Sequence, residues 1–299
     1  MNYKILFRSQ NLRFKILQCL SWVPDSVMLR IQYRIKTGRW PNLKHPQRFT
    51  EKLQVYKMKY RNPLMHQCVD KYEVRKYVEN KGLRHILNDF YGIYDKAEDI
   101  NLRKLPNQFV IKSTTGSGGF NVILVKDKTM VFQDDILEVI NSWLLNNDRQ
   151  ISAGREWAYS GLTKSRIIIE KYLEDKQGLV DYKFFCFNGE PMYLYVVTDR
   201  RMGKSVALRV FDMDFSPLNV FRCDERKLET PIEKPENFEQ MLEIAKVLSA
   251  DFPHVRVDLY NLDGKIYFGE LTFYDGSGYF LYEPDDFDII AGRYFTEYS

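Results

Sequence analysis

The chain has 299 residues and a formal net charge of +4, and 44% of its residues are hydrophobic, enough for a large core and two or three subdomains. Its four cysteines show no C-x-x-C spacing, which argues against a disulfide scaffold and fits a reducing cytoplasm. No apolar run approaches the roughly 18–20 residues that span a bilayer, and charges interrupt the N-terminus where a signal peptide would be apolar. We expect a cytoplasmic protein that is soluble or peripheral at the inner face of the cell membrane.

Basic side chains are concentrated at the N-terminal end. Residues 1–61 hold 14 Lys/Arg and two acids, a balance of +12, whereas the remaining residues hold 30 basic and 38 acidic side chains, a balance of −8. A basic segment of this kind favours an anionic partner, and three stay open: an acidic membrane surface, a uronate-rich glycan, and the acidic remainder of the chain itself. We do not expect nucleic acid as a partner, because no RNA- or DNA-binding module is recognisable.

The N-terminal part of the chain is predicted to be mostly helical. Helical spacing of apolar residues runs through 1–36, 50–60 and 71–81, and Gly82 ends the last of these helices. A turn-rich stretch over 89–99 then leads to an apolar strand.

Strands dominate the later part of the chain. Helices are predicted at 131–146 and 235–249, the second packing on a sheet. The predicted strands are 166–170, 181–187, 192–198, 206–212, 255–260 and 265–272. We therefore expect an α+β fold with a helical N-terminal region, a small lid that carries a β-hairpin, and a C-terminal mixed or antiparallel sheet.

A glycine-rich loop joins two apolar strands in FVIKSTTGSGGFNVILV, from Phe109 to Val125. Its glycines can present successive backbone N–H groups to an anion, and Lys112 adds a positive charge beside them. Neither a Walker A motif nor G-x-G-x-x-G is present. The segment predicts either a hairpin lid over nucleotide phosphates or an ordinary flexible turn. The candidate phosphate-binding residues of the loop are Gly116, Ser117, Gly118 and Gly119.

Two carboxylates fall on neighbouring predicted strands in VRVDLYNLDGKIYFGELTFYDGSG, from Val255 to Gly278. Such a pair suits a hard cation such as Mg²⁺. A two-residue Asp-Gly turn would pair Val257 with Glu270 and put the two acids on opposite faces. A three-residue turn would pair Arg256 with Glu270, so that Arg256, Asp258 and Glu270 share one face. A surface hairpin with solvated acids is the structural alternative.

A third segment, RIIIEKYLEDKQGLVDYKFFCFNGEP from Arg166 to Pro191, holds a short buried strand, a break and an Asn-Gly hairpin turn. Taken in order, a lysine strand with a glycine loop, an I-I-E-K-Y-L hinge and D-x11-E on a hairpin resemble the ATP-grasp superfamily. Within it the chain resembles the TupA-like branch, which is named for teichuronopeptide synthesis and found among capsule and cell-envelope polysaccharide genes. The resemblance runs from Arg48 to Gly278 and includes RFTEKLQVYK, VDKYEVRKYVENKGL and REWAY.

This resemblance implies a site for ATP. The implied contacts are Lys71 and Lys112 for the α- and β-phosphates, Glu170 and Lys171 for the adenine edge, the backbone of Leu173 at the hinge, and Glu174 or Asp175 for the ribose. Two structural alternatives stay open. Lys71 would pair only with acids of its own helix, and Glu170 would be an ordinary strand-end residue.

The resemblance also implies a metal site and catalytic cations. Asp258 and Glu270 would bind Mg²⁺, and Arg256 would stabilise developing negative charge. ATP-grasp ligases often carry E-x-N at the second metal position, whereas Thr272 of this chain supplies a hydroxyl in place of the amide oxygen. Asp275 is a candidate replacement ligand. Lys183 either reaches the γ-phosphate or is an ordinary strand lysine.

The implied activity is that of an ATP- and Mg²⁺-dependent carboxylate–amine ligase that works through an acyl phosphate under a closed lid. Its substrates would be an amine and a carboxylate of a polysaccharide or lipid-linked glycan, joined as an amide on a uronic acid. We expect residues 1–104 to form the N-terminal region, 105–171 the lid and 172–299 the catalytic part. Two other functions stay open, a glycosyltransferase of polysaccharide biosynthesis and a non-catalytic nucleotide-binding module.

Overall fold

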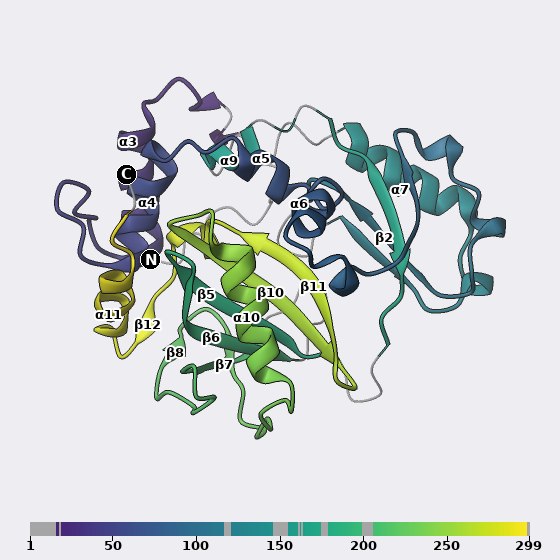
Figure 1. Cartoon of the computed structure of the whole chain (residues 1–299). Coiled ribbons are helices and arrows are strands. Elements are labelled where there is room, and N and C mark those ends of the chain that lie inside the picture. Colours follow the sequence, from purple (N-terminus) through teal and green to yellow (C-terminus); the bar gives the residue numbers. More distant parts are fainter. Residues whose placement is uncertain are drawn as a thin grey trace.

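The computed structural model describes residues 16–17, 19–116, 121–145, 155–160, 162, 164–174, 179–198 and 206–297. These residues form one larger and one smaller sheet, a two-stranded ribbon and the helices that surround them. Helices from the N-terminal part lie beside the larger sheet, and the smaller sheet lies at the other end of the molecule with its own helix (Figure 1). The predicted α+β architecture is confirmed.

Helices and turns dominate the described residues before 87, as predicted. The elements are α3 (Asp25–Thr37), α4 (Phe49–Lys59), α5 (Leu64–Val69), α6 (Val74–Asn80) and the 3-10 turn η1 (Arg84–Ile86). The helix expected from residue 71 begins later, because the Asp70 carboxylate caps a turn by accepting from the N–H groups of Tyr72 and Glu73 at 2.8 and 2.9 Å. Lys71 therefore lies in the turn that leads into α6. The predicted helix over residues 1–15 lies outside the described residues.

The smaller sheet, which we call the lid sheet, is antiparallel with strand order β1-β4-β2-β3. Its strands are β1 (Phe90–Tyr94), β2 (Phe109–Ser113), β3 (Val122–Val125) and β4 (Ile167–Lys171). The helical elements between these strands are α7 (Gln133–Leu145) and the 3-10 turns η2 (Ala97–Asp99), η3 (Leu102–Lys104) and η4 (Lys128–Met130). Sequence reasoning missed β1, because every residue of this edge strand is at least partly exposed and none of the usual apolar alternation appears.

The strands of the lid sheet have one apolar and one partly polar face. The side chains on the apolar face pack with α7 into a small core and include Phe109, Ile111, Ile167 and Ile169. Residues one position along the strands point to the opposite face. Since Val110 pairs with Glu170 and Lys112 pairs with Ile168, Lys112 and Glu170 both lie on this second face.

The larger sheet, which we call the main sheet, has strand order β11-β10-β5-β6-β7-β9. Its strands are β5 (Asp181–Phe187), β6 (Glu190–Thr198), β7 (Ala207–Phe211), β9 (Arg226–Lys227), β10 (His254–Leu262) and β11 (Lys265–Thr272). All neighbours are antiparallel except β7 and β9, so the sheet is mixed. The predicted hairpin turn between β5 and β6 forms at Asn188 and Gly189, with φ angles of 50° and 81°. A separate ribbon pairs β8 (Phe221–Arg222) with β12 (Tyr282–Glu283).

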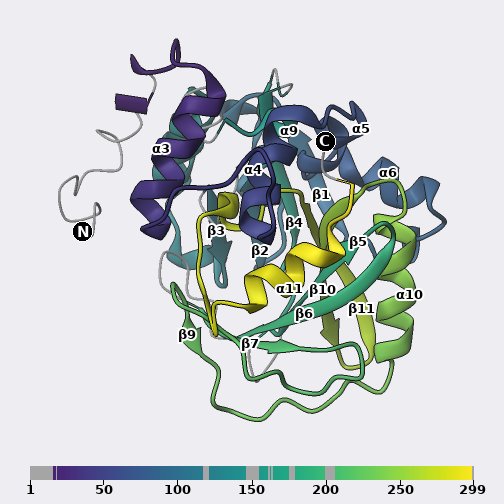
Figure 2. The ribbon, with the colours of Figure 1, turned by 90° about the vertical axis from the view of Figure 1, so that its left-hand side faces the viewer.

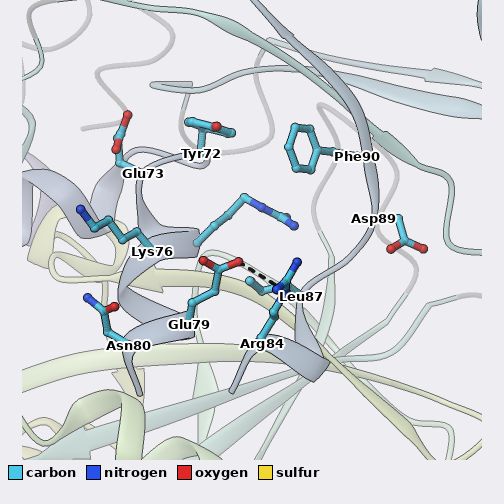
Figure 3. A pocket seen from close by; sticks show the side chains of 10 residues that line it. Tyr72, Glu73, Lys76, Glu79, Asn80, Arg84, Leu87, Asp89 and Phe90 are labelled. Atoms are coloured by element: carbon cyan, nitrogen blue, oxygen red, sulfur yellow. Dashed lines mark ion pairs between the residues drawn. The ribbon is translucent and has the colours of Figure 1, made fainter. Parts of the chain in front are cut away.

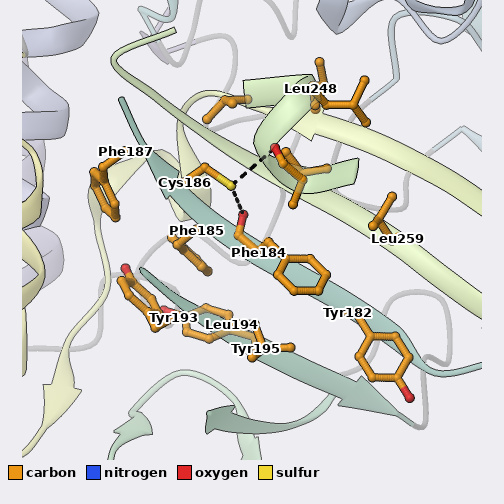
Figure 4. Close-up of a cluster of buried hydrophobic side chains, with 14 of the residues drawn as sticks. Tyr182, Phe184, Phe185, Cys186, Phe187, Tyr193, Leu194, Tyr195, Leu248 and Leu259 are labelled. Carbon is orange, nitrogen blue, oxygen red and sulfur yellow. Dashed lines mark hydrogen bonds between the residues drawn. The ribbon is translucent and has the colours of Figure 1, made fainter. Parts of the chain in front are cut away.

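One face of the main sheet is apolar and is covered by α10 (Phe238–Ser249) (Figure 1). Phe184 of β5 contacts Phe238 of that helix, with ring centres 5.9 Å apart. Figure 4 shows the cluster that Phe184 joins, in which side chains of β5 and β6 lie beside Leu248 of α10 and Leu259 of β10.

The other face of the main sheet is divided between an aromatic and a charged part. Phe185, Phe187 and His254 pack against Phe49 of α4, and α4 lies between α3 and α11 (Phe287–Tyr294) (Figure 1). Further along the same strands the side chains on this face are charged, and those of Asp181, Lys183, Arg256 and Asp258 are buried. No helix in the described part of the chain is both long and apolar enough to cross a membrane.

Candidate active site

Asp258 of β10 lies directly opposite Glu270 of β11. The turn that joins the two strands is of the two-residue kind, at Asp263 and Gly264 with φ angles of 49° and 78°. On its own this turn would set Glu270 beside Val257 and put the acids on opposite faces. The three-residue turn that we considered from the sequence is not the one that forms, yet the acids share a face.

A bulge at Gly269 brings the acids onto the same face. Leu259 pairs with Phe268 but Asp258 pairs with Glu270, so β11 holds one extra residue at this point. Glycine suits this position, because a Cβ on Gly269 would lie 2.9 Å from the backbone oxygen of Asp258 and the strands would have to shift. The two carboxylates are therefore direct cross-strand neighbours, whereas the three-residue turn would have made them diagonal neighbours.

Arg256 joins these oxygen groups into one cluster. Its Nε and Nη2 donate to the two oxygens of Asp258, each at 2.7 Å. Nη2 also donates to Glu270 Oε1 at 3.2 Å and to Thr272 Oγ1 at 3.1 Å, while Nη1 donates to Asp275. Burial alone would lower the pKa of the Arg256 guanidinium, but the charges of Asp258 and Asp275 raise it well above its ordinary value.

Alternating charges extend from this cluster on both sides. Lys183 contacts Asp258 and lies 2.7 Å from Asp181. On the other side Asp275, the candidate replacement ligand, accepts from Arg222 at 2.9 Å as well as from Arg256, so it is engaged by two guanidinium groups. Burial raises the pKa of Asp258 to about 6, and its two cationic neighbours act in the opposite direction.

The lid sheet contributes a second ion pair. Lys112 Nζ lies 2.6 Å from Glu170 Oε2 on the face that points away from the lid core. Arg75 of α6 lies 3.9 Å from the other oxygen of Glu170, and its guanidinium lies 4.7 Å from the centre of the Phe90 ring. Sequence reasoning did not identify Arg75, because its contact with Glu170 depends on how α6 packs beside β1 and β4.

Lys71 connects the lid sheet with the acids of the main sheet. Its backbone N–H donates to the Thr114 carbonyl at 2.9 Å, and its ammonium donates to the carbonyl of Gly116. Burial lowers the pKa of the Lys71 ammonium, the charge of Glu270 opposes this shift, and the charge of Lys112 adds to it. Both predicted phosphate-binding lysines are therefore within electrostatic range of each other, and Lys71 is also within range of a predicted metal ligand.

The predicted hinge residues follow β4. The N–H of Lys171 donates to the Asp89 carbonyl at 2.9 Å, and its carbonyl accepts from Asn88 Nδ2 at 2.8 Å, so both backbone groups are bonded within the protein. Leu173 is half-buried and Glu174 is exposed in an irregular stretch. The predicted contacts that lie outside the described residues are Ser117, Gly118, Gly119 and Asp175.

A polar hollow of about 690 Å³ lies next to this site. Its lining comes from the turn before α6, α6 itself, the segment after it and the start of β1, and Figure 3 shows Lys76, Glu79 and Phe90 among the side chains around it. Arg75 belongs both to this lining and to the contact with Glu170. The hollow includes neither of the predicted phosphate-binding lysines, so it does not coincide with the predicted site.

The oxygen groups on β10 and β11 are of the kind that a hard cation takes as ligands. The carboxylates of Asp258 and Glu270 share a face with the Thr272 hydroxyl, which donates to Glu270 at 3.3 Å. Ligand sets made of oxygen suit Mg²⁺, which usually shares its coordination with substrate phosphates. The set is small, because within the described ranges no three His, Cys, Asp or Glu side chains are grouped to hold a metal.

A second buried polar cluster lies beyond the end of β11, where η5 (Asp275–Gly278) meets α4 and α9 (Trp157–Ser160). Lys57 Nζ donates to the Ser277 carbonyl at 2.6 Å and lies 3.7 Å from Glu156, which also accepts from the Ser277 hydroxyl. Burial raises the pKa of Tyr159, and the charges of Glu156 and Glu270 raise it further, so Tyr159 lies within range of both this cluster and the site. The signal available in the sequence was REWAY, which contains Glu156 and Tyr159.

Several solved structures match the chain at low identity. A D-alanine–D-alanine ligase from Bacillus anthracis is 22% identical, with 69% of this chain and 57% of that chain covered and a TM-score of 0.43. An L-amino acid ligase from Bacillus licheniformis is 16% identical, with 71% and 44% covered and a TM-score of 0.43. The protein thus spans little more than half the length of the first of these ligases. No curated protein matches the chain.

The chain also matches a family model over most of its length. The model describes the TupA-like ATP-grasp proteins, and it covers residues 51–296. This range takes in α4 from Glu51 onward, the lid sheet and the whole main sheet, including every residue of the candidate site. The resemblance seen in the sequence is confirmed, and the protein belongs to the TupA-like ATP-grasp family.

Proposed function

We propose that this protein is an ATP- and Mg²⁺-dependent ligase that joins a carboxylate to an amine. One observation carries the proposal. Lys71 donates its ammonium to the carbonyl of Gly116 in the glycine-rich loop and its backbone N–H to Thr114, close after Lys112, and the charges of Lys112 and Glu270 both act on that ammonium. ATP-grasp proteins use ATP with Mg²⁺, and a pair of lysines beside paired acids suits a triphosphate and its metal.

The proposed reaction is the one that the family resemblance implies, and the charges of the site support it. A carboxylate oxygen of the acid substrate attacks the γ-phosphorus, the bond to ADP breaks, and an acyl phosphate forms. The nitrogen of the amine then attacks the acyl carbon, the C–N bond forms, phosphate leaves and the amine gives up a proton. Lys71 and Lys112 would neutralise the phosphates, Lys183 would reach the γ-phosphate, and Arg256 would stabilise the tetrahedral oxyanion. Mg²⁺ on Asp258, Glu270 and Thr272 would neutralise further phosphate charge.

Internal ion pairs hold Lys112, Lys183 and Arg256 in place before the substrates bind. Lys112 pairs with Glu170, and Arg256 and Lys183 pair with Asp258. Moving an unpaired charge into a buried site is costly, so each pair keeps its cation close to the position where a phosphate would take over as partner. In the proposed complex Lys112 turns to a phosphate, and Glu170 accepts from the amino group at the adenine edge.

The acid substrate in our proposal is a uronic acid of a capsular or cell-envelope polysaccharide, or of its lipid-linked precursor. Membership of the TupA-like family supports this choice, and so does the balance of +12 in residues 1–61, which favours an anionic partner. A place in the cytoplasm, at the inner face of the cell membrane, belongs to the same proposal. The division into residues 1–104, 105–171 and 172–299 stays a prediction.

The test is substrate-dependent nucleotide turnover by the full chain. With ATP and Mg²⁺, release of ADP and phosphate is expected only when a uronate oligosaccharide and an amine are both supplied, and Asp258→Asn should abolish it. Lys104→Gln, an exposed lysine of the lid sheet region, is the control and should keep full turnover. Binding of nucleotide sugars in place of ATP would favour a glycosyltransferase, and ATP binding without turnover would favour a non-catalytic module.

A further inference from the structure

Exposed apolar side chains gather along α3 and at both of its ends. Val27, Ile31 and Ile35 are 45%, 40% and 50% exposed, and their four-residue spacing places them in one row along the helix. Trp22 just before the helix and Trp40 just after it are 79% and 64% exposed. Figure 2 shows α3 on the outside of the molecule. A run of exposed apolar side chains of this kind on a folded protein indicates an interaction site.

Both tryptophans are held out by segments that are tied to the body of the protein. Before α3, the Arg155 guanidinium donates to the carbonyls of Leu20 and Val23 at 2.7 and 2.6 Å, and so fixes the turn that carries Trp22. After α3, Arg39 forms a two-fold ion pair with Asp285 at 2.7 and 3.0 Å, directly beside Trp40. The fold therefore presents these rings to solvent in a defined arrangement.

Basic side chains are interleaved with the apolar row. Arg30 and Arg34 are exposed on α3, and helical spacing places them beside Val27 and Ile31. Residues 22–44 contain five basic residues and one acid. A second copy of the chain that offered the same face would bring like charges together, which disfavours a symmetric dimer through this surface. A partner that is both anionic and apolar complements it.

We propose that α3 and its two flanking tryptophans form a docking surface for an anionic lipid bilayer. The tryptophan rings would lie at the level of the lipid headgroups, and the apolar row would enter the outer acyl region. The arginines would bind anionic headgroups. Only the biological purpose of this surface rests on the proposed function. A lipid-linked glycan acid is anchored in the membrane, so a protein docked there would meet its substrate.

Vesicle sedimentation with the full chain tests the surface. We expect binding to vesicles of phosphatidylglycerol and phosphatidylcholine in equal parts, and much weaker binding to phosphatidylcholine alone. Trp22→Ala with Trp40→Ala should lower the partition coefficient about tenfold or more, since each large side chain loses its apolar transfer. Ile31→Ser with Ile35→Ser should lower it severalfold. The matched control is Leu124→Ser with Val139→Ser, two lid side chains that are each 41% exposed, and it should leave binding unchanged.

A separate pair of variants tests how much the basic side chains contribute to vesicle binding. Arg30→Gln with Arg34→Gln should weaken binding to the anionic vesicles by at least about tenfold at low salt and reduce its salt dependence. Arg103→Gln with Lys104→Gln, an exposed basic pair of η3, is the control and should change neither. Equal loss in both double variants would mean that total charge and not this surface drives binding, and the proposal would be overturned.

Quenching of tryptophan fluorescence by brominated lipids shows which rings enter the bilayer. Trp22→Phe and Trp40→Phe should each remove part of the quenched signal, whereas Trp143 and Trp157 should contribute none. Absence of binding to the anionic vesicles overturns the proposal. So does a concentration-dependent dimer that Ile31→Ser with Ile35→Ser abolishes.

The outcome is separable from that of the proposed function, because ATP turnover with soluble substrates should be unchanged in every α3 variant. Vesicle binding that depends on α3, in a protein without ATP turnover, would support the docking surface and contradict the proposed ligase activity.

Discussion

Lys112 and Glu170 form an ion pair on the face of the lid sheet that points away from the lid core, with 2.6 Å between the ammonium and the carboxylate. Both are predicted nucleotide contacts, so nucleotide binding has to exchange this pair for two new partners. The two residues should then show different defects when they are replaced, although they are joined in the free protein.

We predict that Lys112→Met raises the Kd for ATP about tenfold or more, because a charge-assisted contact to phosphate is lost. Glu170→Gln should mainly reduce the preference for ATP over GTP, because its acceptor at the adenine edge is altered. Isothermal titration calorimetry with both nucleotides measures this, and Lys104→Met serves as the control. Identical defects in the two variants would show that the pair acts only as a structural tie.

Gly269 is predicted to be essential for the geometry of the acids. Gly269→Ala should cost about 1–3 kcal/mol of stability, because the new methyl group meets the Asp258 backbone, and it should also weaken ATP binding by disturbing the register of Asp258 and Glu270. The control is Gly82→Ala, where φ is 77° and nothing lies within 4 Å of the added Cβ. It should cost about 1–2 kcal/mol through its backbone alone and leave ATP binding intact. Thermal unfolding and calorimetry separate the two effects.

Asp275 and Asp285 allow a comparison of a buried and an exposed carboxylate, since each accepts from two arginines. The Asp275 side chain is 3% exposed and the Asp285 side chain is 47% exposed. Asp275→Asn should lower the free energy of unfolding by about 3–5 kcal/mol, because two buried guanidinium groups lose their shared counter-charge. Asp285→Asn should cost no more than about 1 kcal/mol. Urea unfolding measures both losses. Similar losses would argue that the buried charges around Arg256 and Asp275 do not stabilise the fold.

His254 is predicted to make stability fall in mild acid. It is buried among aromatic rings, one ring nitrogen bonds the Cys186 carbonyl at 2.9 Å, and the other has no hydrogen-bond partner among the described residues. Burial lowers the pKa of His254 from 6.5 to about 4. A lowered pKa gives stability that is complete above pH 6.5 and is lost as the pH falls through about 4, and it amounts to about 3 kcal/mol.

The measurement for His254 is the free energy of unfolding between pH 7 and pH 4. His254→Asn can keep the bond to Cys186 and should flatten this dependence, whatever its effect on stability at pH 7. His85→Asn replaces an exposed histidine and should leave the slope as it is. A slope that persists in His254→Asn would assign the acid sensitivity to carboxylates.

The elements that sequence could predict are those with a local signal. The period of 3.6 residues located α7 and α10, and Asn188-Gly189 located the β5–β6 hairpin. The chemistry of paired acids also pointed to Asp258 and Glu270. Their register could not be predicted, because a lone glycine in a strand permits a bulge without requiring one.

What escaped prediction depends on contacts between distant segments. Arg75 meets Glu170, and Lys57 meets Ser277, only after α6 and α4 have packed on strands far along the chain. Neither residue differs locally from an ordinary helical cation. Asp275 was considered as a metal ligand from its position after β11, but the guanidinium groups on either side of it come from β8 and β10.

The edge strand β1 has a practical consequence for engineering. It comes from residues 90–94, before the glycine-rich hairpin, yet it completes the hydrogen bonding of β4 on the far side of that hairpin. A chimera that imported only residues 105–171 from a relative would have to pair a foreign β4 with the native Phe90–Tyr94. Transplanting the segment from residue 88 onward would move the strand, the Asn88 contact to Lys171 and the lid together as one exchangeable unit.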